Sequence, residues 1–143
     1  MDKKDIMFFI GNYWAKNHIL SNDQMFFDFQ YRHEDDLQFV LALDNNNRIV
    51  GVLGYIQYDP KKNEQDIALA LWKVIPNLSD PVLGIKLIEY LRDNIKHRSM
   101  FCVGINKKNI AVFKFMGFQT GKLLHFAAFN TECKTFSIAI PPL

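Results

Sequence analysis

The stretch Val74–Leu91 reads VIPNLSDPVLGIKLIEYL. It begins at the end of an apolar run typical of a buried strand and continues through a loop with two prolines. A helix running to about Ile95 should follow, because apolar residues recur at helical spacing. Those residues are Leu83, Leu87, Ile88 and Leu91. The loop holds a single glycine, Gly84, so the stretch predicts a strand, a stiff loop and a helix in direct succession.

Three strands are expected before this stretch. Their ranges are Leu37–Asp44, Arg48–Asp59 and Asp66–Ile75. Asn45–Asn47 between the first two is a turn signal, because asparagine tolerates left-handed backbone, and the pair should form an antiparallel hairpin. The third strand is apolar on both faces, which indicates a central position in a sheet.

The chain should begin with two helices. Apolar residues of the first fall on one face at helical spacing. They are Ile6, Phe9, Ile10, Tyr13 and Trp14. In the second, shorter helix, either Ser21 or Asn22 is expected as the N-cap.

The elements after Leu91 complete the order. A buried strand is expected over Met100–Ile105, and a short helix over residues 108–116 should end at Gly117, a residue suited to a helix C-terminus. Final strands are expected over Lys122–Asn130 and Thr135–Ile140. The order predicts an α/β fold with a single mixed, mostly antiparallel central sheet flanked by helices, in one domain spanning residues 1–143.

Composition excludes several classes of function. The net charge of +2 comes with scattered lysines and arginines, so no nucleic-acid partner is expected. The two cysteines lack metal-ligand spacing, so no metal site is expected. No apolar run is long enough for membrane insertion, and a cytoplasmic protein is the default expectation.

The element order and two motifs resemble the GNAT superfamily of acyl-CoA-dependent N-acyltransferases. The family pattern V-x-P-x-x-(Q/R)-x-x-G-x-(G/A) is matched in register by Val74, Pro76, Ser79, Val82 and Gly84. The pattern N-x-x-A-x-x-x-Y-x-x-x-G-F is matched by Asn106, Asn109, Phe113, Gly117 and Phe118. The resemblance covers roughly residues 37–130, and it implies the GNAT fold with acetyl-CoA as the co-substrate.

The resemblance also implies where acetyl-CoA would bind. The pantetheine arm would bond to the free backbone edge of the central strand, from Leu71 through Trp72 to Val74. The pyrophosphate would lie on backbone N–H groups at the helix N-terminus, where donors lack helical partners and the helix dipole favours anions. The residues implied there are Val82, Leu83, Gly84, Ile85 and Lys86, and Asn106, Asn109 and Phe113 would also reach the co-substrate. Val82 replaces the first glycine of the family loop, which makes close approach of a phosphate harder.

A narrower likeness concerns the acceptor. The segments HILSNDQMFFDFQY, LALWKV and GFQTGKLLHF look like those of GNAT enzymes of surface-polysaccharide and amino-sugar pathways. The likeness implies a small amine acceptor such as an amino sugar. The acceptor would meet His18, Asp28 and Tyr31 of the N-terminal helices, together with Trp72. Exposed aromatic residues and a late strand would permit a homodimer.

The catalytic groups are less defined. His125 in the segment KLLHFAAF is the first candidate for a general base, and a histidine with a purely structural hydrogen bond is an equal alternative. Asp66, which opens the central strand, could act through a water molecule, although a solvated carboxylate at a strand end is the simpler interpretation. Phe113 stands where the family often has a tyrosine that protonates the leaving thiolate, and phenylalanine has no proton to donate.

Two alternatives to the enzyme follow from these departures. Val82 and Phe113 are compatible with a catalytically weak or inactive acyl-CoA-binding or interaction domain of the same fold. A helper domain of a longer polysaccharide enzyme, active only with its missing part, is the third hypothesis.

Overall fold

The computed structural model describes residues 2–58 and 65–124. The chain divides into two compact units, Met1–Gly104 and Ile105–Leu143, which are treated separately below. The single domain expected from the sequence stays a prediction. Among the described residues, no helix is long and apolar enough to cross a membrane.

The first unit begins with four short helical segments. They are α1 (Lys3–Phe9), the π-helical turn η1 (Ile10–Trp14), α2 (Ile19–Asn22) and α3 (Gln24–Tyr31). Ile6, Phe9 and Ile10 are buried, as their spacing predicts, but Tyr13 and Trp14 are 45% and 41% exposed. The reason is the π turn, in which the Ala15 N–H donates to the Ile10 carbonyl at 3.0 Å and so rotates the last residues away from the expected face.

The N-cap predicted for the second helix is wrong. Ser21 and Asn22 lie inside α2, and α3 is capped by Asp23, whose Oδ1 accepts a hydrogen bond from the Phe26 N–H at 2.9 Å. An aspartate is as good an N-cap as serine or asparagine, so the three candidates could not be separated by residue type.

A four-stranded sheet forms the centre of this unit. Its strands are β3 (Phe39–Leu43), β4 (Ile49–Tyr58), β5 (Asp66–Val74) and β6 (Ser99–Phe101), in the order β3-β4-β5-β6. The first two pairings are antiparallel and the third is parallel. A small ribbon of β1 (Arg32–His33) and β2 (Asp36–Leu37) precedes it. The mixed, mostly antiparallel sheet is therefore confirmed.

Several predicted element bounds shift. The hairpin turn is confirmed, and Asn47 adopts the left-handed conformation at φ 59°. The last strand of the sheet covers Ser99–Phe101 instead of Met100–Ile105. Residues 122–124 are not in a strand, and the remainder of the two predicted C-terminal strands lies outside the described residues.

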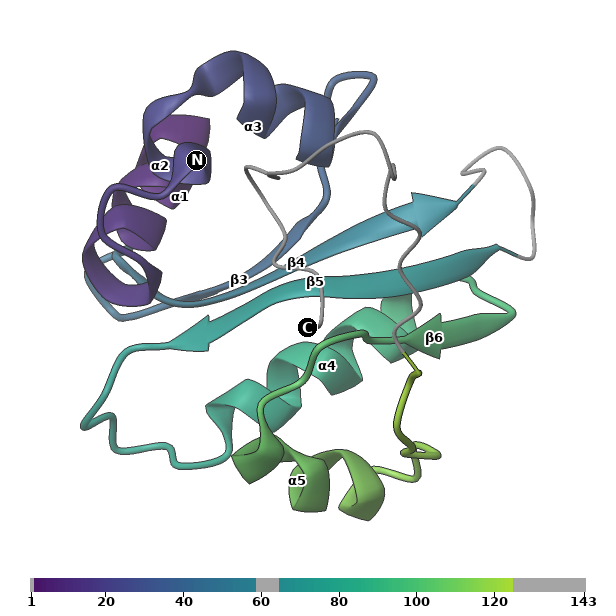
Figure 1. The fold of residues 1–143 in the computed structure, drawn as a ribbon. Coiled ribbons are helices and arrows are strands. Elements are labelled where there is room, and N and C mark those ends of the chain that lie inside the picture. The colour runs from purple at the N-terminus through teal and green to yellow at the C-terminus, as the bar shows by residue number, and fades with distance from the viewer. Residues whose placement is uncertain (1, 59–64, 125–143) are drawn as a thin grey trace, which may run out of the picture. The chain divides into compact units, whose positions relative to one another are not determined.

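Helices cover both faces of the sheet (Figure 1). Val52 and Leu71 face the core formed with α1, α2 and α3. Gly51 points the opposite way, because a Cβ there would contact Leu87 of α4 (Leu83–Asn94) at 3.2 Å. The N-terminal helices and α4 therefore lie on opposite faces.

The second unit is described from Ile105 to residue 124. Its elements are the 3-10 turn η2 (Lys107–Asn109) and α5 (Ile110–Phe115). Gly117 follows α5 at φ +87° and its N–H donates to the Lys114 carbonyl, which confirms the predicted helix end.

Candidate active site

The central strand β5 is bonded along only part of one edge. Its pairing with β6 covers Asp66, Ile67 and Ala68 and ends there. From Leu69 to Val74, the edge of β5 that faces away from β4 has no neighbouring strand among the described residues. The β5–β6 pairing therefore ends in the middle of β5, at Ala68.

A bulge interrupts β5 where β6 ends. Tyr55 of β4 pairs with Leu69 and Gly54 pairs with Leu71, so Ala70 has no partner residue on β4. A bulge bends the strand and redirects its peptide groups. The bulge and the end of the β6 pairing therefore fall next to each other in the middle of β5.

The helix α4 begins a short loop after β5. Leu83 donates weakly to the Asp80 carbonyl at 3.4 Å, and Lys86 donates to the Val82 carbonyl at 3.1 Å. Within the described residues, the N–H groups of Gly84 and Ile85 have no hydrogen-bond acceptor. Two amides at the positive end of a 12-residue helix can bind an anion.

Trp72 explains the single glycine of the loop. Its indole Nε1 donates to the Gly84 carbonyl at 3.0 Å. A Cβ at position 84 would lie 2.9 Å from the Trp72 ring, closer than side chains tolerate. Gly84 is therefore required by the packing of the indole against the helix, in addition to any role toward a ligand.

Asp80 already occupies part of the predicted anion site. Its carboxylate accepts from the Val82 N–H at 3.1 Å and from the Lys86 ammonium at 2.6 Å. The hydrogen bond from Lys86 is the main cause that lowers the pKa of Asp80, and the Val82 N–H contributes in the same direction. An internal anion thus holds two of the predicted phosphate-binding groups. The sequence prediction overlooked Asp80, although an aspartate just before a helix start is a frequent capping signal.

Asp66 is engaged at the other end of β5. Arg98 donates to both carboxylate oxygens, and the Ser99 hydroxyl donates to Oδ1 at 2.7 Å. The Arg98 hydrogen bond, with that from Ser99, lowers the pKa of Asp66 below its usual value. A carboxylate with a lowered pKa is a weaker base, so this geometry favours a structural role.

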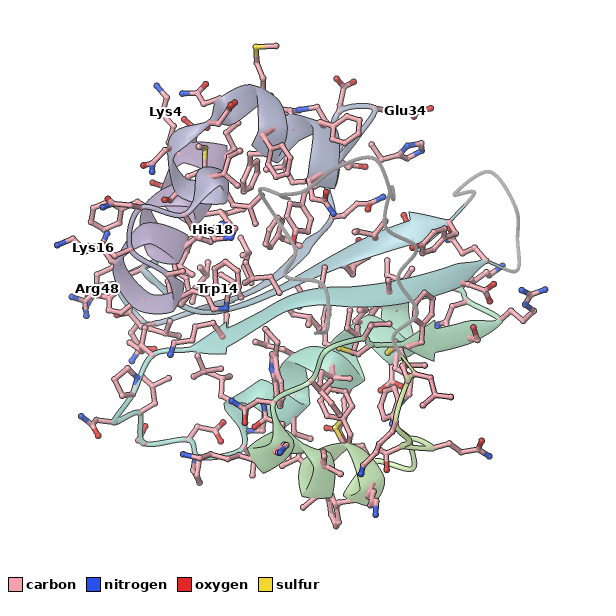
Figure 2. The ribbon with its side chains drawn as sticks, in the orientation of Figure 1. Lys4, Trp14, Lys16, His18, Glu34 and Arg48 are labelled. Atoms are coloured by element: carbon pink, nitrogen blue, oxygen red, sulfur yellow. The ribbon has the colours of Figure 1, made fainter. Side chains whose placement is uncertain are left out.

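The three predicted acceptor residues of the N-terminal helices do not form a common polar cluster. His18 caps α2, since its Nδ1 accepts from the Leu20 N–H at 3.2 Å, and its ring lies edge-on to Trp14 (Figure 2). Asp28 pairs with Lys3 at 2.6 Å and with Arg32 at 3.0 Å. Tyr31 is 3% exposed, and burial raises its pKa to about 12.

The residues of the second motif lie in the second unit. Asn106 caps η2 by accepting from the Lys108 N–H at 3.0 Å. Asn109 is half-buried, and Phe113 is 4% exposed with its ring edge-on to Phe118 at 5.1 Å. His125 lies outside the described residues. Within the first unit, the structure brings together Trp72 of β5 and Gly84 of α4.

Comparison of the whole structure identifies the fold. The chain is similar to AAC(6')-Iy bound to a bisubstrate analogue, CoA-S-monomethyl-acetylneamine, with a TM-score of 0.64, 14% identity and coverage of 90% of this chain and 91% of that one. It is also similar to glucosamine-6-phosphate N-acetyltransferase from Arabidopsis thaliana, with a TM-score of 0.60, 11% identity and coverage of 91% and 95%.

A third similar structure is the aminoglycoside acetyltransferase HMB0005 from an uncultured soil metagenomic sample, with a TM-score of 0.52 and 19% identity. There the matched region spans 65% of each chain, less than two thirds of the neighbour's length. No protein-family model matches the sequence, and no curated protein sequence does either. The fold is that of GNAT acetyltransferases, as the sequence predicts.

Proposed function

We propose that the protein is an N-acetyltransferase that transfers an acetyl group from acetyl-CoA to a small amine. The observation that carries this proposal is the end of the β5–β6 pairing at Ala68, beyond which β5 continues toward the first turn of α4, where the N–H groups of Gly84 and Ile85 have no acceptor among the described residues. An extended, amide-containing chain that ends in a pyrophosphate has the chemistry to occupy both. Acetyl-CoA is such a molecule, and it supplies a thioester that an amine can attack.

Different residues of the chain would bind the parts of acetyl-CoA and stabilise the transition state. Backbone groups of Leu71, Trp72 and Val74 would bond the pantetheine arm, and the first turn of α4 from Val82 to Lys86 would hold the pyrophosphate. A backbone N–H beside the bulge at Ala70 would stabilise the negative charge that develops on the carbonyl oxygen. The N–H donors of the loop require no side chain, so Val82 does not remove them. Asn106, Asn109 and Phe113 stay proposed contacts of the co-substrate.

Proton transfer would require little from the protein. A thiolate leaves readily because its conjugate acid has a pKa near 8.5, which tolerates Phe113 at the usual tyrosine position. His125 is the first proposed base for removing a proton from the amine, with Asp66 acting through water as the second. The ion pair with Arg98 makes Asp66 the weaker of the two.

The proposed acceptor is an amino sugar of surface-polysaccharide synthesis. Two neighbours in structure are named for amino-sugar acceptors, the glucosamine-6-phosphate enzyme and the aminoglycoside enzyme. His18, Asp28, Tyr31 and Trp72 are the proposed acceptor contacts. A cytoplasmic location and a homodimer complete this proposal.

Calorimetric titration with acetyl-CoA and with CoA tests the donor half of the proposal. We expect saturable one-to-one binding of both, followed by thiol release when amino sugars and other small amines are added. Absence of binding at millimolar ligand would overturn the proposal.

Asp80 favours one alternative, a catalytically weak or inactive acyl-CoA-binding domain. Because its carboxylate holds Lys86 and the Val82 N–H, a bound pyrophosphate would have to displace it. Phe113 adds the loss of the usual proton donor. This alternative predicts that CoA binds but that no amine in a broad panel releases thiol above the rate without protein.

A further inference from the structure

A groove lies between the N-terminal helix and the β3–β4 turn. We call it the α1–hairpin groove. Its lining residues are Asp5, Phe8, Phe9, Tyr13, Asn47, Arg48 and Ile49, and its volume is about 300 Å³. That volume is at the lower end of the range for small-molecule sites, which usually combine apolar walls with a few polar groups.

One wall of the groove is aromatic and open to solvent. Phe8 is 70% exposed and Tyr13 is 45% exposed. Phe9 is buried behind Tyr13, with the ring centroids 5.1 Å apart, and so supports the exposed ring. The π turn η1 contains Tyr13, and π turns within helices frequently occur at functional sites.

The polar groups of the groove are planar, and two of them, Asp5 and Arg48, have partners of their own. Asp5 Oδ2 accepts from the Asp2 N–H at 3.2 Å as part of the α1 capping box. The Arg48 guanidinium is held by Asp44, with Nε and Nη2 at 2.8 and 2.7 Å from Oδ2. Each group keeps further hydrogen-bonding positions, since a carboxylate has four acceptor sites and a guanidinium has five N–H donors. Asn47 adds an amide with both donors and an acceptor.

The charges of the groove favour an uncharged polar ligand. Asp5 would repel an anion, and Arg48 would repel a cation even though Asp44 balances most of its charge. Planar donors and acceptors beside exposed aromatic rings suit a molecule with several adjacent hydroxyl groups and an apolar face.

We propose that the α1–hairpin groove binds a pyranose sugar ring. The C–H face of the ring stacks on Tyr13 and Phe8, and its hydroxyl groups bond to Asp5, Asn47 and Arg48. None of the residues that line the groove is among the proposed contacts of acetyl-CoA or of the acceptor amine. It is therefore a second site, and it does not depend on acetyl-CoA binding.

An NMR titration of the full chain with glucose tests the proposal. We expect saturable amide shifts confined to residues 5–13 and 46–49, with an affinity in the millimolar range. Tyr13→Ala and Phe8→Ala should each weaken binding about threefold to tenfold through loss of stacking. Phe29→Ala is the matched control, since Phe29 is 84% exposed on α3 and does not line the groove. We expect this variant to bind like the wild type.

Sorbitol separates a ring site from general affinity for polyols, because it carries similar hydroxyl groups on an open chain. We expect it to produce no saturable shift. Binding of sorbitol as tight as that of glucose, shifts outside the groove, equal weakening by Phe29→Ala, or no saturable shift with glucose would each overturn the proposal. Two separate groove variants keep the test valid should one of them fail to fold.

Discussion

The first half of β5, Asp66–Ala68, is bonded to a strand on each side, whereas the second half, Leu69–Val74, is bonded only to β4 among the described residues. Side chains anchor the two halves differently. Asp66 is held by an exposed ion pair with Arg98, while Trp72 is held by close packing and a hydrogen bond to Gly84. One strand thus carries a charged anchor where β6 pairs with it and a packed aromatic anchor beyond the end of that pairing.

Of the variants that test the difference between the two halves of β5, Gly84→Ala should have the largest effect. The added Cβ would lie 2.9 Å from the Trp72 ring, and overpacking of this kind destabilises by about 1–3 kcal/mol. The higher helix propensity of alanine, about 1 kcal/mol, offsets part of that loss. We expect a lower free energy of unfolding in urea and weaker CoA binding.

Gly121→Ala provides the control, because a Cβ there meets nothing within 4 Å. A double-mutant cycle adds the decisive result: in a Trp72→Ala background, Gly84→Ala should no longer destabilise. A loss of stability that persists without the indole would contradict the steric explanation.

Trp72→Phe should have the next largest effect. It keeps an aromatic ring but removes the N–H that donates to the Gly84 carbonyl, a bond worth about 0.5–1.5 kcal/mol. We expect a matching decrease in the free energy of unfolding and a weaker CoA titration. Trp14→Phe serves as control, since no hydrogen bond from the Trp14 indole occurs among the described residues. An equal effect of both variants would mean that the Trp72 bond does not position α4.

The sequence predicted the local elements but not the contacts that hold β5. The hairpin and α4 were predictable because Asn45–Asn47 and the apolar spacing of residues 83–91 act locally. The contact between Trp72 and Gly84 joins residues on two elements, and no periodic pattern indicates which ring lies against a helix. The end of the β5–β6 pairing at Ala68 and the π turn at Ile10–Trp14 likewise depend on tertiary packing.

Asp80→Asn should change ligand binding more than folding. Asparagine can still accept the Val82 N–H, but it releases the Lys86 ammonium and removes a negative charge from the helix start. If pyrophosphate binds here, CoA affinity should rise about twofold to fivefold, the range expected for one exposed ion pair. Asp93→Asn, which breaks the Arg92 pair near the far end of α4, should leave CoA affinity unchanged. Unchanged affinity in Asp80→Asn would place the pyrophosphate elsewhere.

Asp66→Asn should have the smallest effect on turnover. The size of this effect, together with the pH dependence of thermal stability, distinguishes a structural from a catalytic carboxylate. A general base contributes about 10²–10⁴-fold to a rate, so a fall of that size would identify Asp66 as the base. The ion pair with Arg98 predicts a much smaller change.

Because Arg98 lowers the pKa of the folded Asp66 carboxyl below its usual 3.8, the wild type should hold the stabilisation of this pair at neutral pH. It should then lose that stabilisation as the pH falls through the folded pKa, over a range in which Asp66→Asn loses none from this site. Thermal unfolding of both proteins from pH 7 to pH 2 measures this. Midpoints that stay a constant distance apart would show that the ion pair contributes nothing, and the closed start of β5 would then rest on strand pairing alone.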